Sequence, residues 1–223
     1  MRFVYVEDAV NEQARAWAER FTGAMQREFC VVQADAFSPE EADADLLFFA
    51  TDCRSRRVQH WLDMSRELRI PYVFLTPAMH FPAEVLTSVL APVTMLEEEV
   101  HKAELLSHLA RYTDCSITLL TAHDYGSRAR TNTGKIHTFL DTRQQDLQKT
   151  FTICEQTAKA DSLNLHKEFY NLHSLYELIV WTASRDYGLD DLLFGPAERK
   201  LILHSTVPVA LLNPRGDLYS LCD

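Results

Sequence analysis

The stretch that most constrains this chain lies near its carboxyl end, at residues 176–214. Residues 178–181 are an apolar run that is too short for a helix and rich in β-branched and aromatic side chains, which predicts a strand buried on both faces. Residues 189–204 carry apolar side chains at helical spacing, with acidic residues at the N-terminal end. A second apolar run at residues 207–212 predicts another buried strand. This order of elements is typical of a parallel α/β fold, whose ligands bind at the carboxyl ends of the strands.

An internal repeat relates this stretch to the first half of the chain. The matching segments are ADLLFFATDCRS with YELIVWTASRDY and IPYVFLTP with VPVALLNP. About ten residues separate Asp35 from Asp45 ahead of ADLLFFATDCRS in the first half, whereas about fifty separate Asp124 from Glu177 ahead of its match in the second half. The sequence therefore predicts two domains, a shortened repeat at residues 1–77 and a full repeat at residues 83–223.

The spacing of apolar residues predicts the remaining elements. In the first half the predicted strands are residues 3–6, 29–33, 45–50 and 70–75, and the predicted helices are residues 11–28 and 54–68. In the second half the predicted strands are residues 89–93, 116–122 and 162–165, and the predicted helices are residues 96–112, 135–159 and 168–175. Residues 124–134 are rich in Gly, Ser, Thr and Asn, which predicts a flexible loop that carries Arg128 and Arg130.

Composition excludes several classes of protein. The chain has 223 residues, of which 47% are hydrophobic and 24% charged, as expected for globular domains rather than disordered segments. Its formal net charge of -10 disfavours binding to nucleic acid, because phosphate binding needs a basic face. Five cysteines without a C-x-x-C pair favour free thiols in a reducing compartment. No apolar run is long enough for a signal peptide or a membrane span, so we expect a cytoplasmic protein without membrane contact.

The carboxyl-terminal stretch resembles the tail of a universal stress protein domain. In that family an apolar strand is followed by G-x2-G-x9-G-(S/T), a helix and a final strand. The three glycine positions fall on Thr182, Arg185 and Gly195, and the Ser or Thr position falls on Pro196. Only Gly195 keeps the family's residue, so the nucleotide motif is degenerate. The resemblance covers nearly the whole chain and implies a tandem universal stress protein, with two Rossmann-like, doubly wound parallel sheets of the adenine nucleotide alpha hydrolase-like type.

The resemblance also implies where a nucleotide would bind. In nucleotide-binding members an Asp follows the first strand, and here that position is Thr94. The glycines let backbone N–H groups approach phosphates closely, whereas Arg185 adds bulk and Pro196 removes an N–H. The residues of this degenerate cofactor site are Thr94, Thr182, Arg185, Gly188, Gly195 and Pro196. We therefore expect a non-enzymatic stress-response protein that acts through protein contacts without a cofactor, and the alternative is a switch that binds ATP or AMP.

Two structural expectations follow from the same resemblance. The second half should contain a sheet with strand order 3-2-1-4-5, and the edges at residues 70–75 and 207–212 should meet within the chain as an internal pseudo-dimer. A homodimer and an unidentified protein partner remain open as further assemblies. We also expect Arg185 to fill the phosphate space and to pair with Glu97 and Glu98.

Two other site chemistries are disfavoured by the sequence. His101 and His108 are seven residues apart, as are His166 and His173, whereas metal ligands on one helix prefer a spacing of three or four. The acids that follow the first and third strands resemble those of a phosphoacceptor receiver domain, but no lysine precedes Lys102 to meet a phosphoryl group.

Overall fold

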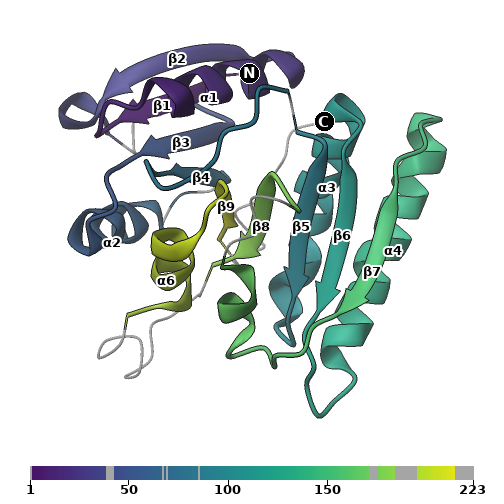
Figure 1. Cartoon of the computed structure of the whole chain (residues 1–223). Coiled ribbons are helices and arrows are strands. Elements are labelled where there is room, and N and C mark those ends of the chain that lie inside the picture. The colour runs from purple at the N-terminus through teal and green to yellow at the C-terminus, as the bar shows by residue number, and fades with distance from the viewer. Residues whose placement is uncertain are drawn as a thin grey trace.

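The computed structural model describes residues 2–38, 43–66, 68, 70–84, 86–170, 175–183 and 195–213. Its strands form one nine-stranded sheet in the order β2-β1-β3-β4-β9-β8-β5-β6-β7 (Figure 1). The strands are β1 (Arg2–Glu7), β2 (Glu28–Gln33), β3 (Leu46–Ala50), β4 (Tyr72–Leu75), β5 (Ser88–Val93), β6 (Ser116–Thr121), β7 (Ile153–Thr157), β8 (Leu178–Thr182) and β9 (Val209–Leu212). The α-helices are α1 (Glu12–Ala24), α2 (Ser55–Ser65), α3 (Lys102–Thr113), α4 (Arg128–Leu147) and α6 (Ala197–His204). The 3-10 helices are η1 (Ala34–Ala36), η2 (Glu97–His101) and η3 (Leu165–Phe169).

The strand order confirms the doubly wound α/β class. In the second half, β7-β6-β5-β8-β9 is the predicted 3-2-1-4-5 order, and all four neighbouring pairs are parallel. The first half contributes four parallel strands in the order β2-β1-β3-β4. The long connection of the second half supplies α4 and β7, which have no counterpart among the described residues of the first half.

The two halves join in one sheet, which corrects the expectation of two sheets. β4 pairs antiparallel with β9, with Tyr72 opposite Leu211 and Phe74 opposite Val209. This confirms that the two predicted edges meet within the chain. The physical reason is that each strand alone would be an edge with unpaired backbone N–H and C=O groups and exposed apolar side chains. Pairing β4 with β9 gives the backbone groups hydrogen-bond partners and buries the side chains.

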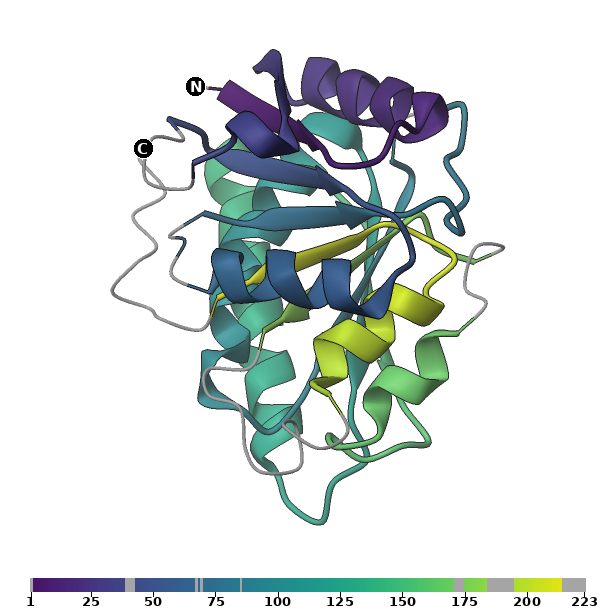
Figure 2. The same cartoon turned by 90° about the vertical axis from the view of Figure 1, so that its left-hand side faces the viewer.

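Helices cover both faces of the sheet. Alternate side chains of each strand point to opposite faces, so neighbours such as Phe48 and Phe49 enter different cores. Phe48 packs with Trp17 of α1 on the face that α3 and α4 also cover. Phe49 stacks on Trp61 of α2 with ring centroids 4.9 Å apart, on the face that α6 and η3 also cover. Figure 2 shows α2 and α6 side by side in front of the sheet.

Three sequence predictions in the second half are wrong. Residues 124–134 are not one loop, because α4 begins at Arg128 and its buried Asn132 and Thr133 bond to the ends of neighbouring strands. The helix predicted to reach residue 159 ends at Leu147, where Gln148 adopts a left-handed conformation with φ of 50°. Residues 162–165 do not form the third strand of the half, since β7 takes that place beside β6.

Three further observations concern the predictions about membrane spans, cysteines and the C-terminal helix. None of the helices in the described part of the chain is both long and apolar enough to cross a membrane. The four cysteines within the described ranges are free thiols, and burial raises the pKa of Cys115 to about 11. Of the helix predicted at residues 189–204, α6 accounts for Ala197–His204, and residues 189–194 lie outside the described part.

Candidate functional site

The carboxyl ends of β5 and β8 lie apart in the sheet. The two strands pair at only two positions, Val89 with Leu178 and Leu90 with Ile179. Pro92 follows on β5 and has no N–H to donate to a ladder. Because the chain winds in opposite directions from β5 and β8, this is the topological switch point where α/β folds bind ligands.

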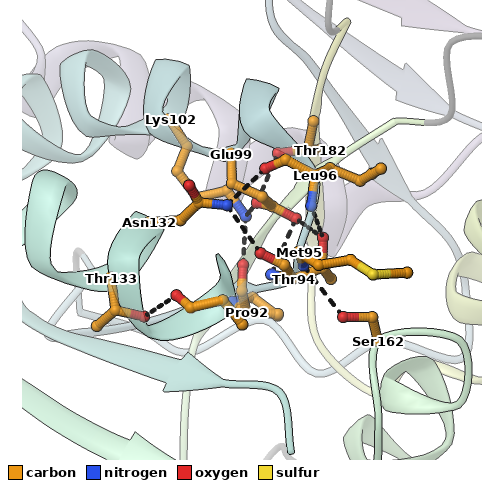
Figure 3. Close-up of polar contacts among 11 residues, drawn as sticks. Pro92, Thr94, Met95, Leu96, Glu99, Lys102, Asn132, Thr133, Ser162 and Thr182 are labelled. Atoms are coloured by element: carbon orange, nitrogen blue, oxygen red, sulfur yellow. Dashed lines mark hydrogen bonds and ion pairs between the residues drawn. The ribbon is translucent and has the colours of Figure 1, made fainter. Parts of the chain in front are cut away.

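A buried carboxylate bridges the two strand ends. Glu99 of η2 is 2% exposed, and its Oε1 accepts hydrogen bonds from Thr94 N at 3.2 Å and Thr94 Oγ1 at 2.6 Å. Its Oε2 accepts a hydrogen bond from Thr182 Oγ1 at 3.0 Å. Figure 3 shows Glu99 between Thr94 and Thr182, so both carboxylate oxygens are used inside the crevice.

A buried lysine neutralises this carboxylate. The Lys102 side chain is 1% exposed, forms an ion pair with Glu99 and donates a hydrogen bond to the carbonyl oxygen of Pro92. Burial lowers the pKa of Lys102, and the charge of Glu99 opposes that shift. A buried charge needs a partner, so the two side chains depend on each other.

The α4 helix fixes the loop after β5. Asn132 Nδ2 donates to the carbonyl oxygens of Thr94 at 3.0 Å and Leu96 at 2.7 Å. Thr133 Oγ1 lies 2.7 Å from Thr121 Oγ1 at the end of β6. The loop that carries Glu99 is therefore held from β5, β6 and α4 together.

The start of α6 is bonded to the first half of the chain. Gly195 has a φ of 75°, in the left-handed region that favours glycine, and the guanidinium of Arg199 packs where a β-carbon would lie. Arg199 Nη1 donates to Gln59 Oε1 of α2 at 3.2 Å. Pro196 precedes the first residue of α6 with φ of -64°. Arg199 therefore occupies the space directly above Gly195.

The structure brings together some of the residues that the sequence singled out. Thr94 and Thr182 are both buried and meet through Glu99. Gly195 and Pro196 lie at the start of α6. Arg185 and Gly188 lie outside the described residues, so the expected role of Arg185 stays a prediction.

Sequence reasoning missed the pair at the centre of the site. Glu99 and Lys102 are three residues apart, and Leu106 continues the same buried stripe four residues later. A charged pair within an otherwise apolar helical stripe is the signal that could have identified them, because charges are rarely buried unless paired.

The first half has a different arrangement at the equivalent position. Asp8 follows β1 as Thr94 follows β5, and its carboxylate accepts hydrogen bonds from Thr51 Oγ1 at 2.9 Å and Trp61 Nε1 at 3.2 Å. Arg57 completes the arrangement with an ion pair to Asp8. Across the described ranges, no group of three or more His, Cys, Asp or Glu side chains is placed to hold a metal ion.

A solved structure shares this architecture. A universal stress protein from Archaeoglobus fulgidus DSM 4304 superposes with a TM-score of 0.56 over 97% of this chain and 88% of that one, at 10% sequence identity. This chain has the fold of a universal stress protein. A putative universal stress protein from Pseudomonas aeruginosa UCBPP-PA14 gives a TM-score of 0.49 at 14% identity, over 96% of this chain and 82% of that one. A universal stress protein in complex with cAMP gives 0.44 at 12% identity, over 58% of this chain and 98% of that one. No family model and no curated protein matches the sequence.

Proposed function

We propose that this chain is a non-enzymatic stress-response protein that acts through protein contacts and does not bind ATP or AMP in the manner of nucleotide-binding universal stress proteins. The observation that carries the proposal is the Glu99 carboxylate between Thr94 and Thr182. A phosphate entering this crevice would compete with Glu99 for the charge of Lys102 and would lie close to the Glu99 carboxylate. It would also have to break the hydrogen bonds that now satisfy Glu99.

The same proposal includes a tandem repeat with a degenerate nucleotide motif. Its support is the symmetric β4 and β9 pairing, in which Val73 lies opposite Ala210 and the flanking pairs mirror each other. Thr182 and Pro196 stand where the motif has a glycine and a hydroxyl residue. In this proposal the two repeats form an internal pseudo-dimer in the cytoplasm, and further assembly is with a second copy or another protein.

A switch that binds ATP or AMP is the second candidate. One observation favours it: Gly195 keeps a positive φ before the N-terminus of α6, where backbone N–H groups attract anions. Arg199 now covers Gly195, so a nucleotide would have to displace its guanidinium from there and from Gln59.

Co-purification separates the two candidates. We expect the protein purified under native conditions to release no stoichiometric adenine nucleotide on heating, as measured by absorbance ratio and chromatography of the extract. Recovery of close to one nucleotide per chain would overturn the proposal in favour of the switch. A role in protein contacts further predicts that a tagged chain retains a protein partner through the same purification.

A further inference from the structure

A pocket of about 470 Å³ opens at the edge of the sheet where β5, β6 and β7 end. It is lined by Met95, His123, Asp124, Tyr125, Lys159, Asp161 and Leu163. Met95 follows Thr94 directly, and Figure 3 shows its side chain pointing away from Lys102. The pocket therefore lies outside the filled crevice, and its volume is within the range of small-molecule sites.

One wall of the pocket is apolar and exposed. Six large hydrophobic side chains are exposed among the described residues, and three of them, Met95, Tyr125 and Leu163, line this pocket. Leu96, a fourth, is adjacent to Met95. Exposed apolar side chains that gather around a concave surface mark a binding site, whereas scattered ones do not.

Two opposite charges in the pocket are available to a ligand. Lys159 and Asp161 are two residues apart, and within the described part of the chain neither forms an ion pair. Asp161 Oδ1 accepts hydrogen bonds from the backbone N and Nδ2 of Asn164, which lower its pKa, so the carboxyl group is ionised at neutral pH.

The second acid of the pocket is already occupied. Both carboxylate oxygens of Asp124 accept hydrogen bonds from Ser162, one from its backbone N and one from its hydroxyl. The polar groups that remain exposed to a ligand are therefore the Lys159 ammonium and the Asp161 carboxylate, which also accepts a hydrogen bond from the backbone of Leu163 and lies near the charge of Lys167.

We propose that this pocket binds a free α-amino acid with an apolar or aromatic side chain. The ligand ammonium pairs with Asp161, its carboxylate pairs with Lys159, and its side chain packs on Met95, Tyr125 and Leu163. A simple anion paired with Lys159 would lie near the like charge of Asp161, and a nucleotide would place its phosphates near Asp124 and Asp161. This inference concerns a different site from the crevice between β5 and β8 and does not rest on the function proposed above.

Titration calorimetry with three matched compounds tests the inference. L-phenylalanine should bind with a dissociation constant on the order of 1 mM or below. 3-Phenylpropionate lacks the ammonium and phenethylamine lacks the carboxylate, so each should bind at least roughly tenfold more weakly. Lys159→Met and Asp161→Asn should each weaken L-phenylalanine by a similar factor, whereas Lys135→Met, which changes an exposed lysine on α4, should not. Thermal melting of each variant confirms that it is folded.

The outcomes separate this inference from the proposed function. If L-phenylalanine fails to bind, or binds no better than the two analogues, the amino-acid site is wrong and the proposed function is untouched. Unchanged binding in Lys159→Met and Asp161→Asn also overturns the site. Micromolar AMP binding that Lys159→Met abolishes would overturn both proposals, because the pocket would then hold a nucleotide.

Discussion

The two halves of the sheet differ in how far their first strand pairs with the next strand toward the middle of the sheet. In the first half β1 pairs with β3 at five positions, from Phe3 to Glu7, so the ladder continues to the carboxyl end. In the second half β5 pairs with β8 at two positions only, and the strand ends lie apart. The same order of strands therefore leaves no gap between the strand ends in the first half and a crevice between them in the second. Pro92 lies on β5 just beyond the last residue that pairs with β8.

The difference also determines which charges each half must bury. The Asp8 side chain is 2% exposed, but its partner Arg57 is 51% exposed and solvent screens the pair. The side chains of Glu99 and Lys102 are only 3% and 1% exposed, so water cannot solvate either charge if its partner is lost. The second half should therefore be far more sensitive than the first to the loss of one partner.

The largest expected effect comes from breaking the junction between the halves. Val209 and Phe74 are fully buried opposite each other, so Val209→Lys places an unpaired charge in the core and we expect loss of soluble, folded protein. Gln156→Lys on the exposed edge strand β7 is the matched control. Soluble expression and circular dichroism check both variants. If Val209→Lys melts like the wild type, the two halves do not depend on their junction.

The next effect concerns the buried pair of the second half. Lys102→Met removes the partner of Glu99 and should lower the free energy of unfolding by about 3–5 kcal/mol, because an uncompensated charge is left buried. Adding Glu99→Gln should restore part of that loss. Urea denaturation measures all three proteins, and a cost below about 1 kcal/mol for Lys102→Met would contradict a buried, mutually dependent pair.

The corresponding change in the first half should cost less. Asp8→Asn keeps an acceptor for Thr51 and Trp61 but removes the charge that faces Arg57. We expect a loss of about 1–2 kcal/mol in the same urea experiment. A cost equal to that of Lys102→Met would show that burial of the partner does not separate the two halves.

Particular residues show how far the sequence could predict this fold and site. The short apolar runs that end at Leu75 and Leu212 are sufficient to predict buried strands, because a run of apolar residues is a local property of the sequence. Their pairing joins residues far apart in the chain, and its prediction depends on the resemblance and on the unpaired backbone groups of an edge strand. The start of α4 was missed because Asn132 and Thr133 favour loops by propensity, and only their contacts in the folded chain favour a helix. Thr94 and Thr182 were found as motif positions, but Glu99 was not, because its burial depends on the gap between β5 and β8.

The smallest expected effect is on the pH dependence of stability. His108 and His166 both lie in the second half, and burial lowers the pKa of each. Burial favours the neutral imidazole in the folded state. The contribution of these two histidines to the free energy of unfolding is therefore full above their ordinary pKa of 6.5, and it is lost as the pH falls through their lowered pKa in the folded protein. His166→Gln should therefore weaken the loss of stability between about pH 7 and about pH 5. His60→Gln, at an exposed position of α2, is the control, and equal pH profiles for the two variants would contradict the assignment.

The most direct test of the filled crevice is calorimetric titration of the wild-type protein with magnesium ATP and with AMP. With Glu99 held by Thr94, Thr182 and Lys102, we expect no heat of binding at millimolar nucleotide. A dissociation constant in the micromolar range would mean that a phosphate displaces Glu99 from Lys102. The claim that Glu99 fills the crevice between β5 and β8 would then be wrong.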